Sequence, residues 1–175
     1  MVKNQHGIIM NCTKCKLSDF RRNIVIGRGS LPCDVCFIGE APGSQEDLFS
    51  EAFIGPSGKL LDEMIKEALQ NKKLSFYFTN TVMCRPCDSI GGSNREPTEE
   101  EILLCSGNVQ KIIDRSKAKL FILVGNVAEK YMKNRVQPYR KIMHPSAILR
   151  HGGKQSSYYL NEMNKLKQIF KEFTK

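Results

Sequence analysis

Cysteine is the residue type whose number and spacing most clearly indicate chemistry in this sequence. Seven cysteines occur, at positions 12, 15, 33, 36, 84, 87 and 105. The chain opens on a short polar segment without the pattern of a secretory signal, which predicts an intracellular protein. Seven thiols in such a protein indicate metal binding or catalysis more than disulfides. The pair Cys12 and Cys15 lies in a polar segment with no strand pattern, as expected of a metal-binding knuckle.

Two further cysteines could complete a metal site with this knuckle. Cys84 follows a strand pattern and Cys105 lies within a helical one. Four thiolates from a knuckle, a strand end and a helix would suit a tetrahedral zinc ion or an iron–sulfur cluster. The spacing does not choose between these metals, and it leaves Cys87 open as the third ligand. Cys33 and Cys36 lead directly into a strand, where we expect Cys36 to pack as a small hydrophobic residue and Cys33 to cap the strand.

Polar residues follow three expected strands at the points where these strands end. The first strand gives way to a loop rich in glycine and proline, from residue 39 to residue 58. This loop carries the carboxylates of Glu40, Glu46 and Asp47. Asn80 lies near the carboxyl end of the next strand, and His144 follows the last one. Because open α/β sheets bind ligands beyond the carboxyl ends of their strands, we expect the three loops to meet in one site.

The hydrophobic pattern predicts the elements that position these loops. Apolar and β-branched runs predict strands over 34–38, 75–82, 119–124 and 140–143. Helical spacing predicts helices over 57–69, 98–114, 126–133 and 157–173. The alternation predicts a three-layer α/β/α sandwich around a small, about four-stranded, mainly parallel sheet. A chain of 175 residues suits a single domain, 1–175, with the cysteine knuckle at its N-terminus.

The charge balance narrows the class of partner. Lys and Arg number 27 against 18 Asp and Glu, for a net charge of +9. Such an excess suits a polyanion such as nucleic acid, with a merely basic surface as the alternative. The sequence contains no long apolar run, so we expect no membrane association.

An ordered set of motifs gives the sequence a specific resemblance. After the leading CxxC the motifs are Gly39-Glu40-Ala41-Pro42-Gly43, Glu46-Asp47, Phe53-Ile54-Gly55, Gly58-Lys59-Leu60-Leu61, Thr79-Asn80-Thr81-Val82, Cys84-Arg85-Pro86, Asn94-Arg95-Glu96-Pro97, Glu101, Cys105 and His144-Pro145-Ser146. From residue 12 to residue 150 the chain resembles the family 4 uracil-DNA glycosylases, the iron–sulfur branch of their superfamily. The resemblance implies an enzyme of base excision repair that hydrolyses the N-glycosidic bond of uracil in single- or double-stranded DNA and leaves an abasic site.

The resemblance also implies how an extruded base would be held, since a glycosylase must take its target out of the stack. Phe53 would stack on the uracil, and Asn80 would read its Watson–Crick edge. An amide can both donate to a uracil carbonyl and accept from N3–H. The backbone at Glu40 and Ala41 would bind the pyrimidine. Glu46 would crowd the C5 side, where thymine carries a methyl group.

The resemblance implies His144 as a catalytic group, and a second catalytic candidate, Glu40, comes from the loop itself. His144 would donate to the uracil O2 as negative charge develops there. Other uracil-DNA glycosylases carry a water-positioning Asp where this chain has Ala41. Glu40 is therefore our candidate for activating water, because two carboxylates in one loop could have separated pKa values. A purely structural Glu40 is the alternative.

The resemblance implies that Cys12, Cys15, Cys84 and Cys105 hold a structural 4Fe–4S cluster, with zinc as the alternative. It places Cys87 outside the ligand set.

Ile148 or Leu149 would wedge into the gap left by the flipped base, or else belong to the core. Candidate phosphate contacts are Arg85, Arg95, Arg150 and Lys154.

We expect a cytoplasmic, non-secreted monomer of prokaryotic or viral origin. Two alternative functions are a uracil-DNA capture protein with little turnover and a metal-stabilised DNA-binding module. The insertion at 88–93 contains no His, which argues against covalent capture.

Overall fold

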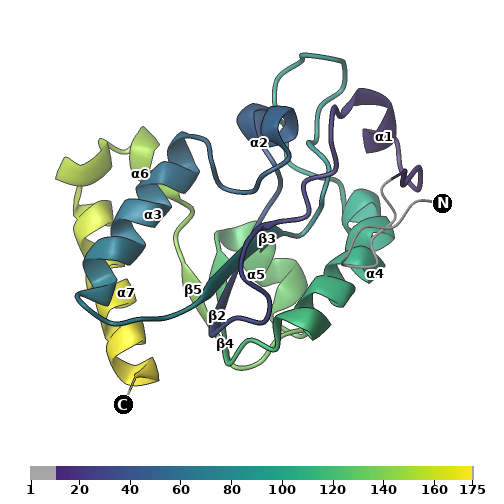
Figure 1. The fold of residues 1–175 in the computed structure, drawn as a ribbon. Helices are drawn as coiled ribbons and strands as arrows, with labels where there is room; N and C mark the ends of the chain where they lie inside the picture. The colour runs from purple at the N-terminus through teal and green to yellow at the C-terminus, as the bar shows by residue number, and fades with distance from the viewer. Residues whose placement is uncertain (1–10, 175) are drawn as a thin grey trace.

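A five-stranded sheet with helices on both faces makes up the protein in this computed structural model (Figure 1), which describes residues 11–174. Residues 1–10, on which the predicted lack of a secretory signal rests, lie outside the described residues, as does residue 175. The strands are β1 (Arg28–Gly29), β2 (Val35–Gly39), β3 (Phe76–Asn80), β4 (Leu120–Val124) and β5 (Tyr139–Ile142). Their order is β1-β3-β2-β4-β5, and β1 alone pairs antiparallel.

The helices form two layers, one on each face of this sheet (Figure 1). They are α1 (Leu17–Phe20), α2 (Ser44–Phe49), α3 (Pro56–Leu69), α4 (Glu99–Ser116), α5 (Asn126–Met132), α6 (Pro145–Arg150) and α7 (Ser157–Phe173). The apolar sides of α3, α6 and α7 pack on one face, and those of α1, α4 and α5 pack on the other. None of the helices in residues 11–174 has the length and apolar character needed to cross a membrane.

The central strand β2 shows why the protein has three layers. All five of its residues are buried, as expected of a parallel strand covered on both faces. Val35 and Phe37 belong to the core beside α3 and α7, whereas Cys36 and Ile38 belong to the core beside α4 and α5. The predicted α/β/α sandwich is confirmed.

The predicted number of strands needs one correction, because the short strand β1 adds a fifth. Arg28 pairs with Phe78 and Gly29 pairs with Tyr77 at the edge of β3. Two residues are too few to show an alternating pattern, so β1 could not be recognised from the hydrophobic pattern. Gly29 has a φ of +109°, and a Cβ atom there would lie 2.2 Å from the Phe76 carbonyl oxygen. Glycine is therefore required at this point.

The strand order reverses beside β2. The chain passes from β2 to β3 on one side and later returns to β4 on the other. The segments that leave β2, β3, β4 and β5 begin at the same edge of the sheet, because these four strands are parallel. A crevice at such a switch point is the usual ligand site of an open α/β sheet.

Candidate active site at the carboxyl edge of the sheet

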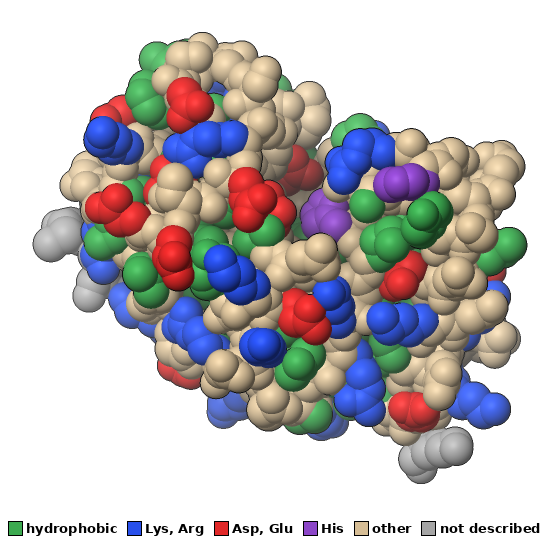
Figure 2. All heavy atoms as spheres, turned by 180° about the vertical axis from the view of Figure 1, so that it is seen from behind, with side chains coloured by type: hydrophobic (Ala, Val, Ile, Leu, Met, Phe, Trp, Pro, Cys, Tyr) green, Lys and Arg blue, Asp and Glu red, His purple; other side chains and the backbone are tan. Residues whose placement is uncertain are grey.

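A cleft of about 900 Å³ opens at this edge. Its walls come from the segments that follow β2, β3, β4 and β5, together with the start of α3. Figure 2 shows the hollow from behind, with histidine, acidic and basic side chains along it. A volume of this size is typical of small-molecule sites. The site residues predicted from the sequence that line the cleft are Glu40, Ala41, Glu46, Phe53, Asn80, His144 and Arg150.

An aromatic ring and a side-chain amide meet where β2 and β3 end. A Cβ atom on Gly39 would lie 2.5 Å from Cζ of Phe53 and 2.6 Å from Oδ1 of Asn80, so both side chains contact one point of the backbone. Phe53 is 6% exposed and Asn80 is 3% exposed. Within residues 11–174 no polar side-chain atom is buried without a partner, and no protein group there pairs with the Asn80 amide. The amide is therefore open to the cleft.

The backbone of Phe53 is held in an unusual conformation, with a φ of +56°. Arg28 from the edge strand β1 donates from Nε to the Ala52 carbonyl (3.0 Å) and from Nη2 to the Phe53 carbonyl (3.4 Å). The same guanidinium is fixed by an ion pair to Asp62 (2.8 Å). A Cβ atom on Gly58 would lie 1.8 Å from the Phe53 carbonyl oxygen, so α3 begins directly against this residue. The sequence analysis missed Arg28, because β1 itself is too short to recognise.

Glu46 ties together two segments of the cleft wall. Its Oε1 accepts from the backbone N–H of Ile54 (3.0 Å) and of Gly55 (2.8 Å), and its Oε2 accepts from Gly43 N–H (3.1 Å). Charge-assisted bonds of this kind are stronger than neutral ones. The carboxylate therefore fixes the loop that carries Phe53 to the loop that follows β2.

His144 presents one ring nitrogen to α6 and the other to the cleft. Its Nδ1 accepts from the backbone N–H of Ser146 (3.2 Å) and lies 2.7 Å from the Ser146 hydroxyl. An N–H group can donate only to an unprotonated nitrogen, so a neutral His144 carries its proton on Nε2. Sequence signals explain this geometry, because Pro145 suits the first position of a helix and His144 caps it.

The protonation of His144 is set by its burial. The pKa of His144 is lowered to about 4, mainly by burial; the positive charge of Arg150 contributes to this lowering, and the carboxylate of Glu46 opposes it. The ring is therefore neutral at neutral pH, with Nε2–H as the available donor.

The pKa of Glu40 is raised, whereas that of His144 is lowered. The carboxyl is half-buried, and burial is the largest cause of its raised pKa. The charge of Glu96 also raises the pKa of Glu40, while Arg150 lowers it. Arg150 thus acts electrostatically on both Glu40 and His144, which shows that the loops after β2 and β5 share one electrostatic environment.

The four predicted metal ligands line a second, smaller cavity on the α4 side of the sheet. Cys12, Cys15, Cys84 and Cys105 border it together with mainly apolar residues, whereas Cys87 does not. Within residues 11–174 no three His, Cys, Asp or Glu side chains meet closely enough to hold a single metal ion. The four thiols of the ligand set implied by the resemblance therefore border one cavity without meeting at a single point, and Cys87 does not border that cavity.

Electrostatics also place these thiols near one another. The pKa of Cys84 is raised to about 12, mainly by burial; the charges of Cys105 and Cys15 add to the rise, and Arg21 opposes it. Burial likewise raises the pKa of Cys105 to about 11. Arg21 donates from Nη1 to the Cys84 sulfur (3.5 Å), as expected for a group that favours the thiolate.

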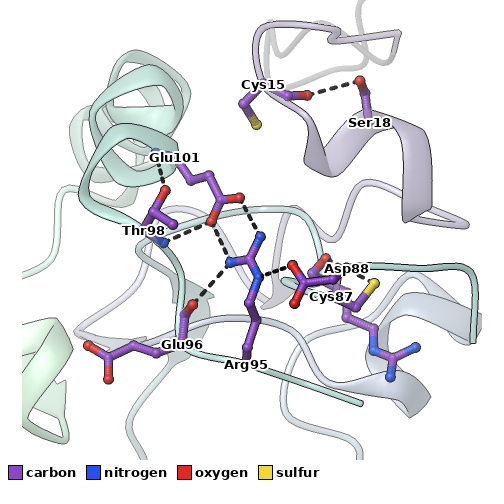
Figure 3. A network of polar contacts seen from close by, with 9 residues as sticks. Cys15, Ser18, Cys87, Asp88, Arg95, Glu96, Thr98 and Glu101 are labelled. Carbon is purple, nitrogen blue, oxygen red and sulfur yellow. Dashed lines mark hydrogen bonds and ion pairs between the residues drawn. The ribbon is translucent and has the colours of Figure 1, made fainter. Parts of the chain in front are cut away.

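Arg95 lines the cleft, and its guanidinium points to Glu101, which borders the cysteine cavity, and to Asp88 (Figure 3). Its guanidinium donates to both carboxylate oxygens of Glu101 (2.7 and 2.9 Å) and to Asp88 (2.7 Å). Glu101 borders the cysteine cavity and also accepts from Thr98 N–H (2.8 Å), completing the capping box of α4. The hydrogen bonds of Arg95 hold the 85–97 loop, which argues against the phosphate contact suggested by the sequence.

Arg85 is engaged in the same loop. It is 8% exposed and donates to Asn94 Oδ1 (2.5 Å) and to the Gly92 carbonyl. The interpretation of Arg85 as a phosphate contact is therefore wrong for this conformation, because a buried and paired guanidinium does not present its charge to DNA.

The sequence that forms the cleft was compared with models of known protein families. A family model described as the uracil DNA glycosylase superfamily matches residues 26–168, a span that runs from β1 into α7. The chain belongs to the uracil DNA glycosylase superfamily.

Several curated relatives within this superfamily bear the name Type-4 uracil-DNA glycosylase. The one from Sulfurisphaera tokodaii is 40% identical over 124 residues, which are 71% of this chain and 54% of the relative. The one from Saccharolobus solfataricus is 39% identical over 124 residues, 71% of this chain and 55% of the relative. The one from Archaeoglobus fulgidus is 35% identical over 126 residues, 72% of this chain and 60% of the relative. The chain spans little more than half the length of these relatives.

The superfamily match confirms the resemblance drawn from the motifs, which lie around the cleft and the cysteine cavity. The two candidates for the wedge residue, Ile148 and Leu149, differ in how far they are exposed. Ile148 is 0% exposed and belongs to the core, which is the alternative left open for it, whereas Leu149 is 42% exposed. Arg150 is exposed beside the cleft. Lys154 is exposed and forms an ion pair with Glu63 (2.5 Å).

Proposed function

We propose that this chain is a uracil-DNA glycosylase that hydrolyses the N-glycosidic bond of uracil in DNA. The observation that carries the proposal is that Phe53, Asn80 and His144, from three separate segments of the chain, line one cleft. The names of the most similar relatives support the same substrate. The reaction would leave an abasic site and begin base excision repair.

Base recognition would rest on Phe53 and Asn80. The ring and the amide lie against the same point at Gly39, so a planar base stacked on Phe53 would present its edge to Asn80. The amide can donate to the uracil O4 and accept from N3–H, whereas cytosine offers an amino group and an unprotonated nitrogen at these positions. Uracil therefore satisfies the amide in a single orientation.

The side of the base that carries C5 would face the wall that Glu46 braces. Because Glu46 uses its carboxylate to join Gly43 to Ile54 and Gly55, the wall has little freedom to retreat. We propose that Glu46 excludes thymine by fixing this wall. The backbone at Glu40 and Ala41, which continues it, would hold the pyrimidine ring.

Departure of the base would be assisted by His144. Breaking the C1′–N1 bond leaves its electron pair on the uracil, and negative charge accumulates on O2. A neutral imidazole whose Nε2–H is directed to the cleft can donate to this oxygen without first losing a proton. Donors placed in this way are typically worth about 3–4 kcal/mol of transition-state stabilisation.

Glu40 is our proposed base for the water that replaces the uracil. The sugar becomes positively charged as the bond breaks, and the water oxygen bonds to C1′ while a water proton passes to Glu40. The raised pKa of Glu40 makes it a better proton acceptor than an exposed carboxylate. Its carboxylate would also stabilise the positively charged sugar.

The DNA itself would lie across the mouth of the cleft. Leu149 is exposed at the end of α6 and would fill the gap left by the flipped nucleotide. Arg150 would contact a flanking phosphate. We propose that the net charge of +9 adds the long-range attraction.

We propose that Cys12, Cys15, Cys84 and Cys105 hold a 4Fe–4S cluster, with zinc as the alternative metal. The four thiols border one cavity, and a set of four thiol donors fits the group. When bound, the cluster would supply a structural cross-link between the N-terminal segment, β3 and α4.

A uracil-containing oligonucleotide tests the proposal directly. The purified protein is incubated with a single-stranded oligonucleotide that contains one uracil and then treated with alkali, which breaks the strand at abasic sites. We expect cleavage at the uracil and none in a matched oligonucleotide with thymine there. The variant His144→Ala should cleave far more slowly than the wild-type protein. An intact strand with retarded mobility would indicate a capture protein, and an intact unbound strand would contradict both functions.

A further inference from the structure

Helix α2 follows the loop that carries Glu40 and Ala41, yet it is not anchored by apolar side chains. Asp47 is the one residue of this six-residue helix that is buried, with 2% of its surface exposed. Leu48 and Phe49, by contrast, are 43% and 62% exposed. A helix this short has little stability of its own, so its position depends on what holds its side chains. Here the side chains that hold it are carboxylates.

The carboxylate of Asp47 faces away from the cleft and binds the segment after α1. Its Oδ1 accepts from the backbone N–H of Arg22 (2.9 Å) and of Asn23 (3.1 Å), and its Oδ2 accepts from Arg22 N–H (3.1 Å). The contact is reciprocal, because Asn23 donates from Nδ2 to the Asp47 carbonyl (2.7 Å). Six atoms of two distant segments, three donors and three acceptors, are thereby joined.

The segment that Asp47 binds is the one that leads from the N-terminal thiols. Ser18 donates from its hydroxyl to the Cys15 carbonyl (2.9 Å) at the start of α1. Arg21, directly before the bound residues, donates to the sulfur of Cys84. Helix α1 is therefore bound to cysteines at its start, through Ser18, and just after its end, through Arg21. Arg22 and Asn23 come directly after Arg21.

The residue before Asp47 in α2 is Glu46, which lines the cleft. The N–H of Asp47 donates to the Gly43 carbonyl (2.9 Å), and Glu46 accepts from Gly43, Ile54 and Gly55. The two neighbouring carboxylates thus point to opposite sides of α2. One binds the walls of the cleft, and the other binds the segment next to the thiols.

We propose that Asp47 is a positioning residue for the base-binding loop, which it fixes to the thiol-bearing N-terminal segment. The effect of Asp47 on the rate of cleavage rests on the proposed glycosylase function, whereas its effect on the position of the loop does not. Without the carboxylate, α2 loses the one buried side chain that holds it, and the loop from residue 39 to residue 47 gains freedom. Glu40 and the backbone at Ala41 would then be displaced from the sugar and the base.

Two substitutions at Asp47 and one matched control test this role. Asp47→Ala removes both acceptor oxygens, whereas Asp47→Asn keeps one oxygen that can accept from Arg22 and Asn23. Glu51→Gln, at an exposed carboxylate two residues beyond α2, removes the same charge without touching the contact. Single-turnover cleavage is measured at saturating single-stranded uracil DNA, at a temperature where circular dichroism shows every variant to be folded. Amide hydrogen exchange is followed in parallel.

We expect Asp47→Ala to lower the rate of cleavage at saturation by about tenfold to 100-fold, since small displacements of reacting groups have effects of this size. Asp47→Asn should recover most of the loss, and Glu51→Gln should match the wild type. Exchange in Asp47→Ala should quicken at residues 21–23 and 39–47 while protection of β4 stays unchanged.

Three outcomes would overturn the inference. They are a cleavage rate for folded Asp47→Ala within twofold of the wild type, unchanged exchange at residues 39–47, and exchange that quickens equally in β4. If the wild-type protein does not cleave uracil DNA, the proposed function fails, and the exchange measurements alone decide the role of Asp47.

Discussion

Asn80 is a side chain whose polar atoms are nearly enclosed by protein but have no protein partner within residues 11–174. Because these atoms reach the cleft, water can satisfy them in the free protein and a ligand can replace that water. The position at the end of β3 is one that sequence alone can identify as a ligand site, since the strand pattern and the carboxyl-edge rule suffice.

Asn80→Ala should lower kcat/KM for uracil DNA by about 100-fold, which corresponds to two lost hydrogen bonds of moderate strength. The melting temperature should change by less than about 4 °C, because the wild-type amide makes no bond to the described protein. Initial rates and a thermal melt measure the two effects. An unchanged kcat/KM would remove Asn80 from the site.

The opposite pKa shifts of His144 and Glu40 predict the pH dependence of the reaction. The raised pKa of Glu40 means that this carboxyl takes up a proton first as the pH falls, above its usual value, while His144 stays neutral until about pH 4. The acid limb of kcat/KM should therefore report Glu40 in the wild type. In Glu40→Gln the residual activity should keep its value to lower pH and fall near pH 4. Rate profiles for the two proteins check this, and a limb near the ordinary pKa of histidine in both would contradict it.

The lowered pKa of His144 also predicts how the stability of the fold depends on pH. Because the pKa of His144 is lower in the folded protein than in the unfolded chain, the unfolded chain binds the proton more readily. This contribution to stability is fully present above the ordinary pKa of histidine and is lost as the pH falls toward 4.

At the scale of elements, the 85–97 loop is fixed by charged side chains more than by apolar ones. Its tip residue Ile90 is 77% exposed, whereas Arg95 is bonded to Asp88 and Glu101. The guanidinium of Arg95 holds the pKa of Glu101 below its usual range. Glu101 also caps α4, so one carboxylate serves both the loop and the helix.

Glu101→Gln should lower the free energy of unfolding by about 2 kcal/mol, since it weakens two charge-assisted bonds to Arg95. It should also expose the 85–97 loop to proteases. Urea unfolding and limited proteolysis measure these effects. Glu100→Gln, one residue earlier and exposed, is the control and should behave as the wild type. Equal stability of the two variants would mean that the ion pair contributes nothing.

The elements differ in how far the sequence could predict them. The four parallel strands and the helices α3, α4 and α7 were predictable because each has enough residues to show its period. Strand β1 has two residues and α2 has one buried side chain, so neither shows an apolar pattern. Their roles depend on the contacts of Arg28 and Asp47 with segments more than twenty residues away, and no local pattern contains that information.

At the scale of the whole molecule, the cysteine cavity joins three parts of the chain that are far apart in sequence. The thiols that border it come from the N-terminal segment, from the end of β3 and from α4. A metal centre there would stabilise the fold, because the buried thiols are otherwise held near one another with raised pKa values. The predicted single domain over 1–175, the monomeric state and the cytoplasmic location stay predictions.

Cys84→Ser should lose iron and lower the free energy of unfolding by more than about 4 kcal/mol, as expected when a structural metal is lost. Cys87→Ser, at an equally buried thiol outside the cavity, is the matched control and should keep the metal. Iron and sulfide analysis together with denaturant unfolding measure both effects. A wild-type protein that contains one zinc ion and no iron would favour the alternative metal, and iron retained in Cys84→Ser would contradict the ligand assignment.

Gly39 has a consequence for how relatives of this protein are compared. A methyl group at that position would collide with the tip of the Phe53 ring and with the amide oxygen of Asn80. A homologue with alanine there could retain every acid, amide and imidazole of the site and still have no room for a nucleobase. Surveys that score only the polar motifs would count such a protein as active, so the missing side chain at residue 39 should be scored with them.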